Sequence, residues 1–172
     1  MFHRTTTGLA AAVLSLGLVA ASAPAATALP DWRTTATAKA NDRARAPKVI
    51  DLRYATHPRF DRVVVDVRGL RPGYSIRYTR HLRQDGSGVE VALHGRRAMT
   101  LRLNPAYAHN QKGSSVYTGP RKRNLDFPTL RGVAFLGDYE GYVTLGFGLD
   151  HRAPYRIFTL SHPRRIVIDF KH

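Results

Sequence analysis

From Lys48 onward, apolar and polar residues alternate with a period of two in short runs separated by turn residues. Met99, Leu101 and Leu103, for example, alternate with polar neighbours. This period is typical of β-strands with one buried face, and no window carries a sustained helical repeat. The pattern predicts an all-β chain folded as an antiparallel sandwich or barrel. The nine candidate strands are residues 50–54, 63–68, 74–79, 89–94, 99–103, 133–136, 142–149, 155–160 and 165–170.

The first 28 residues have the features of a secretory signal peptide. Arg4 precedes an apolar run from Gly8 to Ala21, and Ala26-Thr27-Ala28 matches the small-x-small cleavage pattern. The run is short for a membrane span, which needs about 20 residues. We therefore expect a signal peptide at 1–28 and no transmembrane segment after its cleavage. The protein is therefore expected to be secreted and extracytoplasmic.

The next stretch, residues 29–47, is small, polar and rich in Ala and Thr, with no periodic apolar face. This composition predicts a disordered linker. Trp32 is the one bulky residue within it, and we interpret it as an incidental exposed aromatic side chain. The folded domain is expected at 48–172, where a chain of about 125 residues buries enough surface to fold without disulfides.

Two segments of the predicted domain resemble each other. Residues 57–67 read HPRFDRVVVDV and residues 162–170 read HPRRIVIDF. We interpret them as equivalent turn-strand units, related by a pseudo-twofold axis in a two-layer sandwich. Asp66 and Asp169 are out of phase with one apolar set in each copy, so they are expected to face solvent or a neighbouring Arg.

The long segment 104–132 breaks the strand pattern, and structureless loops of this length are uncommon in compact domains. We expect an ordered excursion with a short helical turn, which covers one open end of the sheet. The residues expected to pin it there are Tyr107, Val116, Tyr117, Leu125 and Phe127. Farther along, Gly146 and Gly148 share one strand face and are expected to let a ring or a facing backbone approach closely.

Several motifs carry a family resemblance. Residues 62–67 (RVVVDV) and 165–170 (RIVIDF) look like the paired strand motifs of AMIN domains. Residues 126–142 (DFPTLRGVAFLGDYEGY) and 145–155 (LGFGLDHRAPY) resemble the AMIN-like domains of exported actinobacterial proteins. The resemblance implies a two-sheet β-sandwich, here of about nine strands, that has no catalytic activity and associates with the bacterial cell envelope.

The residues favour binding over catalysis. The chain has no Cys, and its His residues lack the short paired spacing of a metal site. Gly86-Ser87-Gly88 is not a nucleophile elbow, which requires Gly-x-Ser-x-Gly on a strand-to-helix turn. We therefore predict no enzymatic activity, no cofactor and no metal. A nucleic-acid partner is not expected either, because no recognition helix, zinc site or RNA-binding sheet motif accompanies the positive charge.

The best candidate ligand-binding residues flank the predicted strand 142–149. If that strand is paired on both sides, they form two sites about 20 Å apart, in which aromatic rings, carboxylates and Arg suit a glycan. A solvated acidic hairpin turn is the alternative for Asp138 and Glu140, and a simple ion pair between Arg152 and Asp150 is the alternative in the second group. The first group is Asp138, Tyr139, Glu140 and Tyr142, and the second is Asp150, His151, Arg152 and Tyr155.

The charge of the chain predicts an anionic partner. There are 27 Lys and Arg against 12 Asp and Glu, a net charge of +15. Such a field attracts teichoic-type polymers, phospholipid headgroups and peptidoglycan carboxylates, although a merely solvated basic surface is the alternative. The densest basic clusters, both expected in loops, are Arg96 with Arg97 and Arg121 with Lys122 and Arg123.

We therefore expect a non-catalytic exported module that binds peptidoglycan or an anionic wall polymer, with an envelope protein as a further partner. The alternatives are a secreted small-ligand-binding β-barrel and an all-β wall hydrolase that uses Asp138 and Glu140 as a carboxylate pair sharing a proton.

Overall fold

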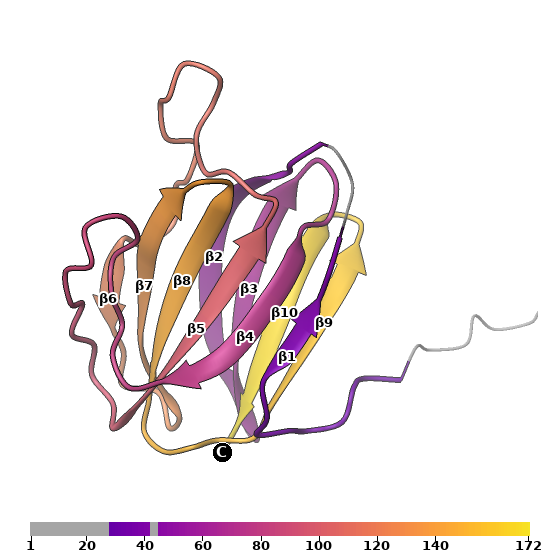
Figure 1. Ribbon diagram of the computed structural model, residues 1–172. Helices are drawn as coiled ribbons and strands as arrows, with labels where there is room; N and C mark the ends of the chain where they lie inside the picture. Colours follow the sequence, from indigo (N-terminus) through magenta and orange to yellow (C-terminus); the bar gives the residue numbers. More distant parts are fainter. Residues whose placement is uncertain (1–27, 42–44) are drawn as a thin grey trace, which may run out of the picture.

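The computed structural model describes residues 28–41 and 45–172, so the predicted signal peptide lies almost entirely outside the described residues. Within those residues, no helix has the length and apolar character needed to cross a bilayer. The described chain forms ten strands (Figure 1), with bounds β1 Thr37–Lys39, β2 Lys48–His57, β3 Phe60–Arg68, β4 Gly73–Thr79, β5 Arg97–Asn104, β6 Lys122–Asn124, β7 Leu130–Tyr139, β8 Tyr142–Leu149, β9 Tyr155–Ser161 and β10 Arg164–Lys171.

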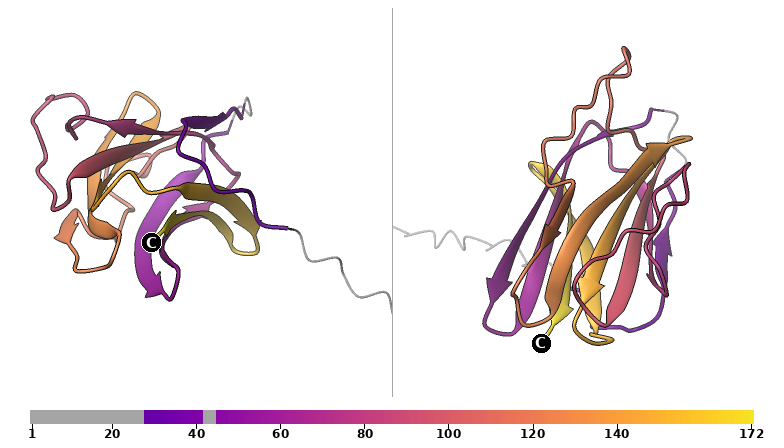
Figure 2. Two further views of the ribbon diagram at one scale, coloured as in Figure 1. Left: turned by 90° about the horizontal axis from the view of Figure 1, so that it is seen from below. Right: turned by 90° about the vertical axis from the view of Figure 1, so that its left-hand side faces the viewer.

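The strands form two antiparallel sheets stacked as a sandwich, which confirms the expected fold class (Figures 1 and 2). One sheet has six strands in the order β1-β4-β5-β8-β7-β6, and the other has four in the order β2-β3-β10-β9. The period-two pattern has its expected effect, because alternate side chains of each central strand point into the space between the sheets. The largest buried side chains there include Tyr155, Phe147, Phe170, Met99 and Leu101.

The two similar motifs lie side by side as β3 and β10 of the four-stranded sheet. Their antiparallel register places Arg62 opposite Asp169 and Asp66 opposite Arg165, with Val64 and Val167 at the centre. A reciprocal register of this kind is what a local twofold axis produces. The two turn-strand units are therefore neighbours within a single sheet of the sandwich.

The outer face of the six-stranded sheet is covered by the loop 80–96. The prediction of a strand at 89–94 is wrong, because this extended segment lies flat on the sheet and forms only an isolated bridge between Arg83 and Glu90. Val91 and Leu93 pack on a small cluster of Leu82, Ala134 and Leu136. Its alternation thus reflects packing against a sheet face and not pairing within a sheet.

Glycines make this close covering possible. A Cβ added at Gly148 would lie 2.0 Å from the His94 carbonyl oxygen, and one at Gly146 would lie 3.0 Å from Leu136 Cδ1. The loop backbone therefore approaches β8 more closely than any side chain permits, as expected from Gly146 and Gly148.

The segment 104–132 is an ordered excursion, as expected, but no helical turn is present in it. Its first part runs along the free edge of β2, where Val49 N–H donates to Tyr107 O and Thr118 N–H donates to Ile50 O. Tyr117 is buried in the core, and Leu125 and Phe127 pack against the core from its edge. The hairpin between His109 and Ser115 projects from the end of the sandwich where β7 turns into β8 (Figures 1 and 2).

The prediction of a disordered linker is wrong for residues 31–41, which we call the N-terminal strap. Arg33 forms a two-hydrogen-bond bridge with Tyr155 at the edge of β9, and β1 then pairs with β4 at the edge of the other sheet. The strap thus joins one edge of each sheet. Trp32 is also not incidental, because its ring lies 4.4 Å from the Arg156 guanidinium carbon and 6.4 Å from the Phe60 ring centre.

Tyr155 holds the strap in place, which leads to a prediction. Its hydroxyl donates to the Thr35 carbonyl (2.7 Å) and lies 2.9 Å from Thr37 Oγ1. Tyr155→Phe is expected to lower the free energy of unfolding by about 1–2 kcal/mol, because these hydrogen bonds are lost without loss of ring packing. Urea denaturation measures the change. Tyr142→Phe is the control, and an equal loss in that variant would contradict the role of Tyr155.

Candidate functional site

The two groups of predicted ligand-binding residues lie at opposite ends of β8. The first group occupies the β7–β8 hairpin, whose two-residue turn is Glu140-Gly141 with φ values of 50° and 77°. Both values are in the left-handed region that a type I′ turn requires. Glu140 and Tyr139 are exposed at this tip, and Tyr139 has 53% of its surface accessible.

Asp138 serves the fold at this end of the sandwich. Its Oδ2 accepts a hydrogen bond from Ala108 N–H at 2.7 Å and lies 2.5 Å from His109 Nδ1. These contacts attach the projecting hairpin to β7. No hydrogen bond joins Asp138 to Glu140 in the described part of the chain, and Asp138 Oδ2 is directed to Ala108 and His109 instead. The expectation of a carboxylate pair is therefore not met by this geometry.

Tyr142 is also engaged, because the guanidinium carbon of Arg102 lies 4.2 Å from its ring centre. This distance is short for a cation–π contact, and such a contact stabilises the ring where it is. The described contacts of the first group thus go to different partners: Asp138 contacts Ala108 and His109, and Tyr142 contacts Arg102. The first group therefore does not form a single site.

The second group is divided between core and surface. Tyr155 is fully buried and belongs to the core, which corrects its interpretation as a ligand-binding residue. Asp150 accepts from Arg96 at 3.0 Å, and His151 Nδ1 lies 3.7 Å from the same carboxylate oxygen. Arg152 does not pair with Asp150: its guanidinium carbon lies 4.6 Å from the Tyr78 ring centre, and it donates to the Thr34 carbonyl.

Arg96 and Arg152 line a basic cavity that we call the arginine hollow. Its volume is about 450 Å³, and it is lined by Tyr78, Thr79, Arg80, Arg96, Arg97, Ala98 and Arg152. The strand order explains the cluster, since Arg80 follows β4, Arg96 directly precedes β5, Arg97 begins β5, and Arg152 follows β8. The basic pair and one member of the second predicted group are thus brought together. Arg80 was not predicted, because it stands alone in the sequence.

The electrostatics of the arginine hollow favour an anion. All four Arg side chains are exposed, and Asp150 balances the charge of Arg96 alone. Glu90 lies nearby but is hydrogen-bonded to His81 at 2.9 Å, and this contact lowers the pKa of the Glu90 carboxyl. Burial raises the pKa of Tyr78 to about 12, so its hydroxyl stays protonated and donates to Ala153 O. Guanidinium groups bind carboxylate and phosphate oxygens through paired N–H donors.

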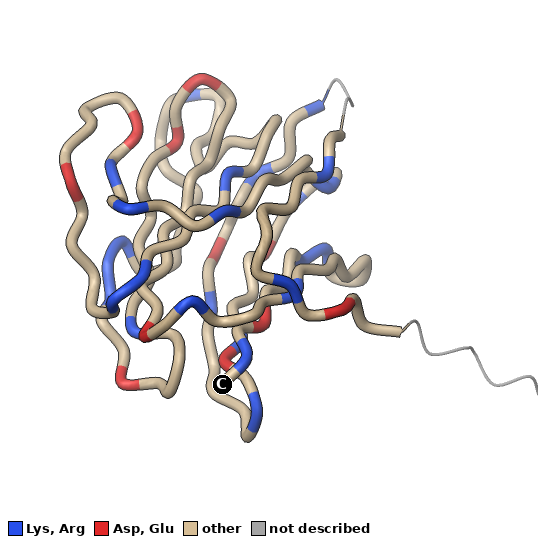
Figure 3. Tube along the Cα trace, turned by 60° about the horizontal axis from the view of Figure 1, so that its bottom comes forward, with Lys and Arg blue, Asp and Glu red and all other residues tan. Residues whose placement is uncertain are grey.

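The second predicted basic cluster is more dispersed. Arg121 is held over the rings of Phe135 (4.6 Å) and Tyr117 (5.4 Å), and it donates to Ser115 Oγ. Lys122 and Arg123 belong to strand β6, not to a loop as expected. Basic residues are also spread over both sheets and the connecting loops (Figure 3), so net charge alone does not mark a site.

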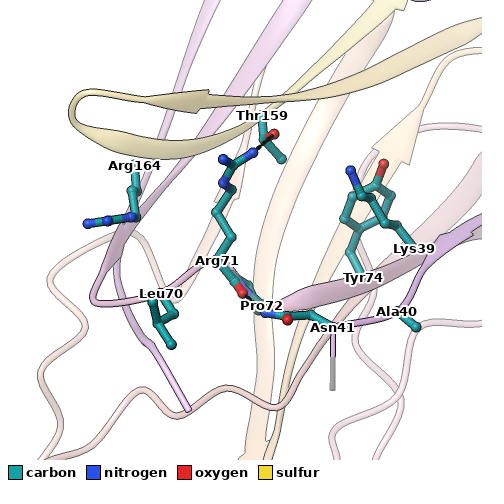
Figure 4. Close-up of a pocket in the computed structure, with 9 residues that line it drawn as sticks. All are labelled: Lys39, Ala40, Asn41, Leu70, Arg71, Pro72, Tyr74, Thr159 and Arg164. Carbon is teal, nitrogen blue, oxygen red and sulfur yellow. Dashed lines mark hydrogen bonds between the residues drawn. The ribbon is translucent and has the colours of Figure 1, made fainter. Parts of the chain in front are cut away.

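A second basic cavity, which we call the slot, lies at the end of the strap, beside the loop that joins β3 to β4. It has a volume of about 340 Å³ and is lined by Lys39, Ala40, Asn41, Leu70, Arg71, Pro72, Tyr74, Thr159 and Arg164. Figure 4 shows Arg71 reaching toward Thr159, to which its Nη1 donates at 2.9 Å, while Lys39 and Tyr74 lie on the opposite side and Arg164 points away. Asn41 Nδ2 donates to the Arg71 carbonyl and ties the strap to this loop. The slot was not predicted, because Lys39 lies in the stretch predicted to be disordered.

Metal-ligating side chains are not clustered in the structure. Among the described residues, no group of three His, Asp or Glu side chains is placed to hold a metal ion. The chemistry that these surfaces offer is the binding of anions by guanidinium and ammonium groups, next to tyrosine rings.

Comparison with known proteins gives a single result. The family model of the AMIN-like domain matches residues 47–172. No curated protein and no solved structure matches the chain.

Proposed function

Because the chain belongs to the AMIN-like domain family, we propose that it is a non-catalytic binding module of the bacterial cell envelope. Domains of this family are in general extracytoplasmic and associated with the cell wall. The finer proposal is that the module binds an anionic polymer of the wall and that the arginine hollow is its main contact site.

The arginine hollow is the observation that carries this proposal. Four exposed Arg side chains from three neighbouring strand ends surround a cavity of about 450 Å³, within the range of ligand sites. Stacking on Tyr78 and the bond to Thr34 O pre-orient Arg152, and Asp150 pre-orients Arg96. Fixed cations lose less conformational entropy on binding, so an anion is favoured here over other parts of the basic surface. A hydrolase that uses Asp138 with Glu140 is not supported, because Asp138 is bound to Ala108 and His109.

Co-sedimentation with purified cell-wall sacculi tests the proposal. The chain from residue 29 to 172 is expected to be retained at low salt and released at high salt, because exposed charge interactions are screened. The double variant Arg80→Ala/Arg97→Ala is expected to lower retention about tenfold or more, since hydrogen bonds to charged groups contribute roughly 1.5–3 kcal/mol each.

The matched control removes the same charge elsewhere. Arg59 and Lys112 are exposed on turns away from the arginine hollow, and Arg59→Ala/Lys112→Ala is expected to retain most of the binding. Equal losses in the two double variants would contradict a defined site. Binding that does not change with salt would contradict an anionic ligand.

A further inference from the structure

We propose that the slot and the arginine hollow are the two ends of one binding track, and that a single linear polyanion occupies both. This inference rests on the proposed envelope-binding function and adds a second site and a preference for chain length. Neither cavity alone is large, but the strap connects them along one side of the sandwich.

The path of the strap carries the first step. Arg152 of the arginine hollow donates to Thr34 O near the beginning of the strap, at 3.1 Å. The strap then pairs with β4 as β1, in a register that places Thr37 beside Ile76 and Lys39 beside Tyr74. Lys39 and the next two residues line the slot. The same short segment therefore contacts both cavities.

Strand β4 fixes their separation. Tyr74 lines the slot and Tyr78 lines the arginine hollow, four residues apart on the same strand. A strand rises about 3.3 Å per residue, so these two rings are roughly 13 Å apart, and the outer cations Arg71 and Arg80 are separated by roughly 30 Å. A polymer of a few repeating units has this length.

The strap carries a further cation. Arg33 is bound by its backbone to Tyr155 and is exposed, and it directly precedes Thr34, whose carbonyl accepts from Arg152. The track therefore has cations in both cavities and a third one on the strap.

The lining of the slot indicates the chemistry of the ligand. None of the described residues that line it is acidic, and Lys39 and Arg71 both contribute cationic side chains to it (Figure 4). Thr159 and Tyr74 add hydroxyl groups, and the Tyr74 ring offers a flat apolar surface. These groups suit a repeating unit that has one anionic group and several hydroxyls. Phosphodiester polymers and carboxylated polysaccharides share this chemistry.

Affinity as a function of chain length tests the track. Isothermal titration calorimetry of residues 29–172 measures the affinity for two probes, poly(glycerol phosphate) and polygalacturonate. Each probe is used as a short chain that fits one cavity and as a long chain that spans roughly 30 Å. Engagement of both cavities by one chain is expected to raise the affinity per chain by about 10²-fold for at least one probe. The probe that shows the gain identifies the polymer class as phosphodiester or carboxylate.

Two double variants locate the effect. Lys39→Ala/Arg71→Ala is expected to remove the gain of the long chain while leaving short-chain binding at the arginine hollow almost unchanged. Arg80→Ala/Arg97→Ala is expected to weaken both chain lengths, and Arg59→Ala/Lys112→Ala to change neither. Thermal melting confirms that each variant is folded. Lys39→Glu reverses the charge of an exposed side chain and is likewise expected to remove the gain of the long chain.

The failures of the two proposals are distinguishable. If short and long chains bind equally well per anionic unit while sacculi are still retained, the track is wrong and the envelope-binding proposal stands. If Lys39→Ala/Arg71→Ala keeps the full gain, the slot is not the second site. If neither sacculi nor polyanions bind, the proposed function itself is wrong.

Discussion

Asp169→Asn is expected to lower the free energy of unfolding by about 3–5 kcal/mol, because it leaves two guanidinium groups with no buried counter-charge. The Asp169 carboxylate is fully buried on the outer face of the four-stranded sheet. It accepts two hydrogen bonds from Arg62, at 2.6 and 2.9 Å, and one from Arg156 at 2.7 Å. These hydrogen bonds raise the pKa of Arg62. In the variant that rise is lost, but a guanidinium group is protonated at neutral pH even without a partner, so both Arg side chains stay charged. Urea denaturation at neutral pH measures the loss.

Aromatic rings add to the cost. Arg62 lies over the Phe60 ring at 5.0 Å, and Arg156 lies between Trp32 at 4.4 Å and Phe60 at 5.3 Å. The rings attract the guanidinium groups, but they also shield them from water. Without the Asp169 carboxylate, the two guanidinium groups are therefore neither paired nor fully hydrated, which adds to the loss of stability.

The chain contains a matched control for this prediction. Asp66 has the equivalent place in the other copy of the motif and accepts two hydrogen bonds from Arg53, at 2.7 and 2.9 Å. The Arg53 side chain is 55% exposed, so Asp66→Asn is expected to cost no more than about 1 kcal/mol. If both variants lost the same stability, burial would not be the cause.

Gly148→Ala is expected to lower the free energy of unfolding by up to about 3 kcal/mol, at the upper end of the range for overpacking. The new Cβ would lie 2.0 Å from the His94 carbonyl oxygen, which is a backbone atom. The loop 80–96 must then move off β8 and carry Arg96 away from Asp150. Thermal unfolding measures the loss, and the variant is also expected to bind sacculi less tightly.

Gly146→Ala separates this effect from a general preference for glycine in β8. Its Cβ would meet only the ends of the Leu136 and Leu82 side chains, at 3.0–3.1 Å. These side chains adjust by rotation, so a loss of about 1 kcal/mol or less is expected. A larger loss in Gly146→Ala than in Gly148→Ala would contradict the contact with His94.

The sequence was sufficient to predict the fold class, because the period-two pattern depends only on which side of a strand is buried. It failed where the same pattern had another cause. Residues 89–94 alternate because Val91 and Leu93 pack on the face of a sheet. Strand β1 was missed for the opposite reason: its Thr, Ala and Lys side chains are not buried, and its pairing depends on the edge of β4, far along the chain.

The site was only partly predictable, since it is assembled by strand order. The pair Arg96 and Arg97 was predicted in one group and Arg152 in another. Only the adjacency of β5 and β8 brings the two groups together. Arg80 and Lys39 had no local signal. Tyr155, in contrast, has the same phase as the buried Ile157, so its place in the core was available from the alternation itself.

The way the sheets end has a consequence for self-association. The six-stranded sheet ends in β1 and β6, which have three residues each, and two of the three β6 side chains are cationic. In the four-stranded sheet, the outer edge of β2 is hydrogen-bonded to the backbone of Tyr107 and Thr118, and the outer edge of β9 is hydrogen-bonded to the backbone of Arg33. A second copy therefore finds little unpaired backbone to extend, which is how natural β-proteins avoid joining edge to edge. For a module that binds a wall polymer as proposed above, such edges would let neighbouring copies occupy one polymer without pairing strand to strand.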